Sequence, residues 1–154
     1  MPRVIFAYDL KKDIENYLNS IYHVRRFAHG RKNYPEMAGK YLFPEDYFTL
    51  LKAEDEKKAR KVAKRIVGAL LVQNEELYSG TKRFLEKVWR KREKRFFVLL
   101  EKFFEKPAYF KKVTAFFTTL PVCPYNRREN WFMVSLRHGI EEQIGTICHE
   151  LMHF

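Results

Sequence analysis

Three residues near the end of the chain, His149, Glu150 and His153, have the types and the spacing of a metal site. Histidines four residues apart lie on one face of a helix, where both imidazoles can bind a single Zn²⁺. Glu150 is rotated about 100° from His149, so its carboxylate can take a proton from water held by the metal. The pattern therefore predicts a zinc cofactor, with Glu150 as the catalytic base for hydrolysis of a peptide or protein substrate.

The residues around this motif are uncharged: they are Thr146, Ile147, Leu151, Met152 and Phe154. With these flanks the sequence resembles the zincin metallopeptidases over about residues 113 to 154. The resemblance implies a zincin-like subdomain, in which a sheet precedes the active-site helix and an upstream strand forms the cleft's upper rim and pairs with extended substrate. By position that strand is 131–136, so the substrate-binding residues are expected to be Trp131, Phe132, Met133, Val134 and Ser135.

Zincins take a third protein ligand from beyond the second histidine, but this sequence ends one residue after His153. We expect the chain to be a fragment of a longer peptidase; a ligand from elsewhere and a vestigial site are the alternatives. Nearby substitutes are poor. Cys148 should project from another helix face, His138 precedes the helix, and Cys123 lies in a proline-rich turn. Cys148 is expected to be a small buried hydrophobic residue rather than a nucleophile, because no separate base is evident.

The first part of the chain predicts one short strand followed by helices. Val4 to Tyr8 is rich in β-branched and aromatic residues, and Asp9 can then cap a helix. Apolar residues recur with helical spacing from Ile14 to Tyr22. His23 and His29 are read as ordinary residues at the end of this helix, which Gly30 and Pro35 terminate. Residues 30–43 are expected to form a loop, and Pro44 to begin a helix over about 44–53.

Two long basic helices are expected next, over 54–78 and 81–106. Residues 57–65 carry six positive and no negative charges, and residues 82–95 carry eight positive and two negative charges. Ser79-Gly80 predicts a break between the helices, and Pro107 ends the second. Arg92 falls on the apolar face of the second helix and must extend to solvent or form an ion pair.

The last part of the chain predicts β structure and one more helix. Residues 113–120 and 131–136 are rich in β-branched and aromatic residues, and the turn residues between them favour two adjacent antiparallel strands. Apolar residues recur with helical spacing over 140–154. The fold class is therefore α+β in a single domain: residues 1–112 form a mainly helical basic part, and residues 113–154 form a small antiparallel sheet packed on the metal-site helix.

The net charge of +11 suggests a second function. The basic helices could bind nucleic-acid phosphates without sequence preference, which would make the histidine motif incidental. They could also be solvated helix faces, or a prodomain-like element that covers the cleft. Two cysteines, no signal-peptide core and no membrane-length apolar run predict a cytoplasmic protein without a membrane partner.

Overall fold

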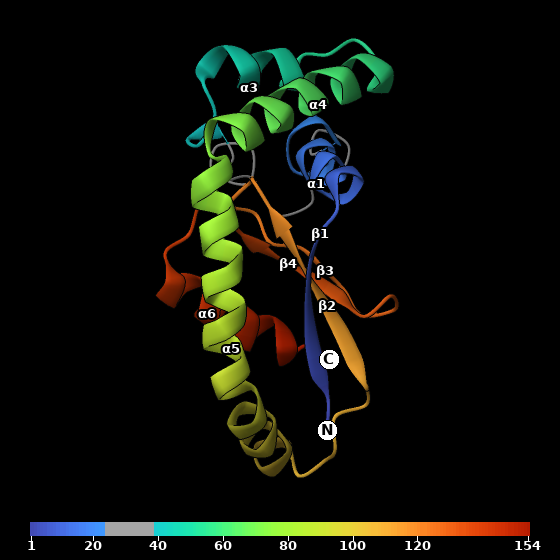
Figure 1. The fold of residues 1–154 in the computed structure, drawn as a ribbon. Helices are drawn as coiled ribbons and strands as arrows, with labels where there is room; N and C mark the ends of the chain where they lie inside the picture. The colour runs from blue at the N-terminus through green and yellow to red at the C-terminus, as the bar shows by residue number, and fades with distance from the viewer. Residues whose placement is uncertain (24–38) are drawn as a thin grey trace.

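The computed structural model describes residues 1–23 and 39–154 (Figure 1). The expectations for His29, Gly30 and Pro35 lie outside the described residues. In chain order the elements are β1 (Arg3–Tyr8), α1 (Leu10–Tyr17), the π-helical η1 (Leu18–Tyr22), α3 (Pro44–Leu51), α4 (Glu56–Gln73), α5 (Glu75–Phe104), β2 (Lys112–Thr118), β3 (Tyr125–Asn126), β4 (Trp131–Ser135) and α6 (Ile140–Leu151). The α+β fold class is confirmed.

The sheet has four strands in the order β1-β2-β4-β3, and it is mixed rather than antiparallel. β1 is parallel to β2, β2 is parallel to β4, and β3 alone runs antiparallel, against β4. The prediction that residues 113–120 and 131–136 form an antiparallel pair is therefore wrong. The chain between them reverses its direction twice, which makes the two strands parallel. It first returns as β3, which pairs with the outer side of β4, and it then turns again at Asn130, which has a φ of 54°. The predicted division at residue 112 also does not separate the sheet, because β1 pairs with β2.

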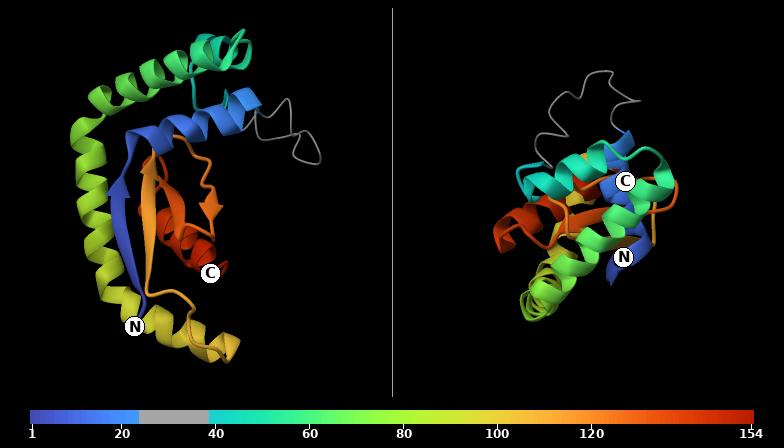
Figure 2. Two further views of the ribbon diagram at one scale, coloured as in Figure 1. Left: turned by 90° about the vertical axis from the view of Figure 1, so that its right-hand side faces the viewer. Right: turned by 90° about the horizontal axis from the view of Figure 1, so that it is seen from above.

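Helices α5 and α6 cover one face of the sheet (Figures 1 and 2). The side chains of alternate strand residues point into this layer, as the period of a strand requires. They form a core with Trp89 and Phe97 of α5 and Ile147 of α6. A second core lies at the end of the sheet where β1 leads into α1. There α1, η1, α3 and α4 pack around Tyr17, Leu18 and residues of the segment after β2.

The predicted helix starts are largely confirmed, and one predicted break is wrong. Asp9 caps α1 by accepting hydrogen bonds from the N–H groups of Lys11 (2.9 Å) and Lys12 (3.2 Å), and Pro44 is the first residue of α3. The bend between the two long helices lies at Asn74, whose side-chain amide donates to the last turn of α4. Helix α5 then continues through Gly80, since one glycine in a long packed helix costs only about 1 kcal/mol. No helix among the described residues has an apolar stretch long enough to cross a lipid bilayer.

Glu93 joins α5 to the edge strand β1. Its carboxylate is buried and accepts a hydrogen bond from the backbone N–H of Val4 (2.7 Å) and one from the indole N–H of Trp89 (3.2 Å). Arg90 forms an ion pair with it at 3.1 Å. The N–H of Val4 would otherwise be a buried donor without an acceptor. The carboxylate of Glu93, on the apolar face of α5, accepts this hydrogen bond in place of a neighbouring strand.

Arg92 lies exposed to solvent, which is one of the two alternatives that the sequence predicted for it.

The carboxylate of Asp13 ties α1 to the carboxyl end of β2. Asp13 is fully buried and accepts hydrogen bonds from the hydroxyl groups of Thr118 (2.6 Å), Thr119 (2.9 Å) and Tyr8 (2.9 Å). The backbone N–H of Thr119 donates to it as well, at 3.1 Å. Burial raises the pKa of Asp13, and the hydrogen bonds from Thr118, Tyr8 and Thr119 oppose that rise. Burial raises the pKa of Tyr8, and the nearby carboxylate of Asp13 raises it further.

Asn16 extends this connection by one helical turn. Its side-chain amide donates to the hydroxyl of Thr118 (2.9 Å) and to the carbonyl of Val122 (2.8 Å), while its own oxygen accepts from Ser20 (3.2 Å). One polar face of α1 is thereby fixed to the segment that follows β2. This segment leads directly to β3.

Replacing Asp13 with alanine should destabilise the fold by about 2–4 kcal/mol, because it leaves several buried donors without an acceptor. Replacing Asp9 with alanine removes only an exposed helix cap and should cost about 1 kcal/mol. Urea unfolding followed by circular dichroism measures both. Equal effects of the two substitutions would contradict the role assigned to Asp13.

Candidate metal centre

The two histidines of the predicted motif lie together on α6. Their Nε2 atoms are 3.3 Å apart, and the ring planes are nearly perpendicular, at 84°. Two Zn–N bonds of about 2.05 Å at a tetrahedral angle would separate the nitrogen atoms by about 3.3 Å. The imidazoles of His149 and His153 therefore already have the separation that a shared zinc ion requires.

A ring from β3 holds one of these histidines in place. The phenol ring of Tyr125 lies parallel to the imidazole of His153, with 4.4 Å between the ring centroids and 3° between the planes. Phe154 packs with its edge towards Tyr125, at 6.3 Å. Stacking against a ring anchored in the sheet restricts rotation of the imidazole of His153.

Glu150 lies on the next face of α6 and is 7 % exposed. Its Oε2 atom is buried and has no hydrogen-bond partner among the described residues. Burial raises the pKa of Glu150, and the neighbouring His149 lowers it to a smaller extent. A buried carboxylate without a partner carries an energetic cost, and such groups occur where a proton or a ligand is to be bound.

These three residues form one wall of a cleft of about 890 Å³. The facing wall is the polar side of α1 and η1, and the segment from Val122 to Asn126 lies between the two. The residues of the facing wall are Lys12, Glu15, Asn16, Asn19 and Ser20. π-Helical segments such as η1 are rare in proteins, but those that occur are often found at functional sites. The extra residue in the turn changes the direction of its side chains.

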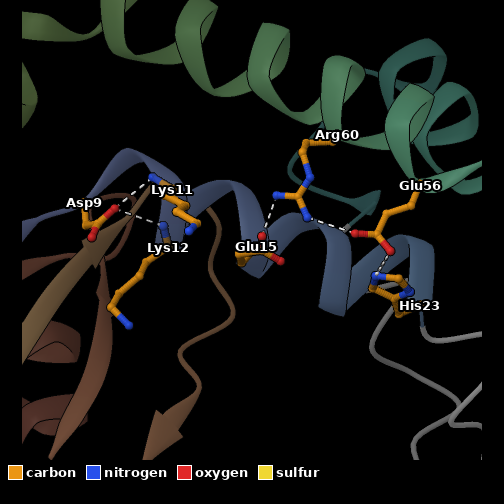
Figure 3. Close-up of polar contacts among 7 residues, drawn as sticks. All are labelled: Asp9, Lys11, Lys12, Glu15, His23, Glu56 and Arg60. Carbon is orange, nitrogen blue, oxygen red and sulfur yellow. Dashed lines mark hydrogen bonds and ion pairs between the residues drawn. The ribbon is translucent and has the colours of Figure 1, made fainter. Parts of the chain in front are cut away.

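A chain of ion pairs connects α1 and η1 to α4 (Figure 3). Glu15 pairs with Arg60, which also pairs with Glu56 at 2.9 Å. Glu56 in turn lies 3.9 Å from Nε2 of His23. His23 therefore is a residue at the end of η1 that contacts α4 and does not line the cleft, in agreement with its interpretation from the sequence.

The strand expected to form the rim of the cleft, Trp131–Ser135, is an interior strand. β4 has β2 on one side and β3 on the other, and the N–H of Met133 donates to the carbonyl of Pro124. Its backbone over Trp131–Met133 is therefore already paired and is not free for a substrate. The edge strand next to α6 is β3, which the sequence patterns did not indicate because it has only two residues.

The side chains of β4 divide between the two faces of the sheet. Trp131 and Met133 line the cleft, whereas Phe132 and Val134 point into the core shared with α5 and α6. Ser135 is buried, and its carbonyl accepts a hydrogen bond from the side chain of Gln143 at 2.9 Å.

Lys12 is a cleft residue that sequence reasoning did not identify. Its ammonium group lies 4.3 Å from the centroid of the Trp131 ring and 3.7 Å from Glu129. It therefore connects the α1 wall to the sheet. Neither Lys12 nor Tyr125 belongs to a spaced motif, so only the fold brings them to the histidines.

A third metal ligand is not present among the described residues: within 1–23 and 39–154 there is no cluster of three His, Cys, Asp or Glu side chains that could hold a metal ion. His138 lines a different hollow with Tyr41, and Cys148 packs against the core. Cys123 lines the cleft, but burial raises the pKa of its thiol to about 12, which a backbone hydrogen bond with Ser135 opposes. It is therefore a thiol rather than a thiolate at neutral pH.

No protein-family model, curated protein or solved structure significantly matches this chain. The chemistry of the cleft depends on the paired imidazoles, the stacked Tyr125 and the unpartnered carboxylate of Glu150.

The zinc geometry predicts that the protein binds Zn²⁺ through His149 and His153 with modest affinity, since half of the tetrahedral shell is left to water or to another ligand. Tyr125→Ala should weaken this binding about tenfold because the ring of His153 becomes free to rotate, whereas Tyr125→Phe should preserve it. Titration with a competing chromogenic chelator measures both. Equal zinc uptake by the parent and a His149→Ala, His153→Ala double variant would show that the ligands are wrongly identified.

The raised pKa of Cys123 predicts slow alkylation. Between pH 7 and pH 9 the thiolate fraction should rise about tenfold per pH unit and remain small. Iodoacetamide labelling of a Cys148→Ser variant, followed by mass spectrometry, isolates the reaction of Cys123. Complete modification within minutes at pH 7 would contradict a protonated, unreactive thiol.

Proposed function

We propose that this chain carries the zinc site of a metallopeptidase, with His149 and His153 as ligands and Glu150 as the general base. The observation that supports this most strongly is the 3.3 Å separation of the two Nε2 atoms, because it equals the spacing that one tetrahedral zinc ion imposes. Two imidazoles on one helix are also a ligand set that selects zinc over magnesium or calcium, which prefer oxygen.

The residues around the histidines support hydrolysis rather than a purely structural metal. Zinc, when bound, would act as a Lewis acid and lower the pKa of water at the site. Glu150 is adjacent to the ligands but lies on a different helix face, where its unpartnered Oε2 can accept a proton from that water. A carboxyl group whose pKa burial has raised can then return the proton to the leaving amine.

The topology supports a peptide as the substrate class. In zincins a rim strand upstream of the active-site helix pairs with extended substrate, and pairing requires a strand at the edge of a sheet. Here that position belongs to β3, Tyr125–Asn126, and not to Trp131–Ser135. Trp131 and Met133 would still contact substrate side chains from within the cleft. This assignment makes the chain a zincin-like subdomain with an unusually short rim.

The third ligand is proposed to come from residues outside those described here, or from a partner. Two protein ligands alone would hold zinc weakly, because half of the tetrahedral shell is left to water or to another ligand. Both cysteines are free of disulfides, and we propose a reducing, cytoplasmic compartment for the reaction.

Glu150→Gln separates catalysis from metal binding. The substitution should leave zinc affinity within about twofold of the parent, because Glu150 is not a ligand, and should reduce cleavage of a quenched peptide library about 100-fold or more, because it removes the proton acceptor. His149→Ala should lose both zinc and cleavage. Thr146→Ala, on the exposed side of α6, is the matched control and should change neither. If the Glu150→Gln variant cleaves peptides as fast as the parent, the hydrolytic mechanism is wrong even where zinc is bound.

A further inference from the structure

The outward face of α5 carries a ridge of cations that neither the fold nor the metal site uses. Arg83, Lys87, Lys91 and Arg95 follow one another at intervals of four residues, and all four side chains are exposed. None of them forms an ion pair within the parts of the chain that the structure describes. The acidic residues of this stretch are engaged elsewhere, since Glu86 and Glu93 both pair with Arg90. We call these four residues the α5 ridge.

The repulsion between these four cations lowers the stability of α5, and no ion pair among the described residues offsets it. Like charges four residues apart on a helix repel each other, and the α5 ridge places three such pairs in succession. The helix does not need them to pack, because its opposite face is held by Leu85, Trp89 and Phe97 in the core. In Figure 2, α5 lies along the outside of the molecule with the sheet on one side only.

The spacing of the ridge fits a partner whose negative charges also repeat. Four residues of α-helix advance about 6 Å and rotate about 40° past a full turn, so the four cations form a row about 18 Å long that winds about 120° around the helix axis. Nucleic-acid strands carry one phosphate per nucleotide at regular intervals, and several Lys and Arg contacts to them give binding that does not depend on sequence. We propose that the α5 ridge binds the phosphate backbone of nucleic acid.

The surface between the ends of the ridge argues against a membrane as the partner. Basic helices that bind bilayers also bury exposed apolar side chains in the lipid. From residue 86 to residue 95 every exposed side chain is charged, while Val88 is half-buried and Trp89 is fully buried. The exposed apolar residues of α5 lie outside this stretch, at Leu77, at Phe84 next to the first cation of the ridge, and from Val98 onward. The middle of the ridge therefore offers charge without an apolar group that could insert.

The test must separate the ridge from the net charge of +11. A ridge variant combines Arg83→Gln, Lys87→Gln, Lys91→Gln and Arg95→Gln. A matched control removes the same charge from exposed lysines elsewhere and combines Lys11→Gln, Lys40→Gln, Lys111→Gln and Lys112→Gln. Fluorescence anisotropy with a labelled 20-base-pair DNA duplex measures affinity between 50 and 200 mM salt, about the range over which phosphate contacts weaken most visibly.

The parent should bind the duplex with a slope of log affinity against log salt of about −3.6, the value for four phosphate contacts. The ridge variant should lose at least tenfold in affinity, while the control stays within about twofold of the parent. Both variants should unfold at no lower urea concentration than the parent, which excludes misfolding as the cause. The proposal is overturned if the parent does not bind at low salt, or if the control loses as much affinity as the ridge variant. Binding to phosphatidylserine vesicles with none to DNA would likewise overturn it. The outcome is independent of zinc and of peptide cleavage.

Discussion

The buried carboxylate of Asp13 is the contact on which the arrangement of this molecule depends. Burying an acidic group costs free energy unless donors surround it, and here Thr118, Thr119 and Tyr8 supply them from the ends of β2 and β1. The donors come from two segments, the end of β1 beside Asp13 and the end of β2 more than 100 residues away, so the carboxylate fixes the angle at which α1 leaves the sheet. One wall of the cleft, formed by α1 and η1, consequently faces α6 at a defined position.

The same principle operates at the other edge of β1, where Glu93 accepts a hydrogen bond from the N–H of Val4. Buried acids thus anchor both helices that flank this strand, and the apolar core fills the space between them. The candidate metal site depends on the same sheet. Tyr125 is held in the short strand β3 and stacks on His153, so the sheet positions one of the two histidines of α6. Glu150 is the one acid in this region that lacks a hydrogen-bond partner among the described residues, which distinguishes it from Asp13 and Glu93.

Sequence patterns predicted the helices and the position of His149 and His153 on one face of α6 because these depend on local spacing. The separation of His149 and His153 follows from the period of a helix, and the cap at Asp9 from the chemistry of one side chain. Strand direction was not predictable in this way. Parallel pairing of β2 and β4 depends on a two-residue strand between them, whose composition carries no periodic signal. The break expected at Gly80 was overridden by the packing of α5. No local pattern distinguishes Asp13 and Glu93 as buried acids, because donors to both come from segments distant in sequence. Lys12 and Tyr125 likewise reach the cleft only because the fold brings together segments that are distant in sequence.

The most direct measurement of the central claim is X-ray diffraction from zinc-soaked crystals at the zinc absorption edge. The account predicts one strong anomalous peak on α6, about 2.1 Å from Nε2 of both His149 and His153, with the carboxylate of Glu150 outside the first coordination sphere and within reach of a coordinated water. An absence of the peak at saturating zinc would contradict the metal centre. A peak that includes a carboxylate oxygen of Glu150 as a direct ligand would contradict its role as the base.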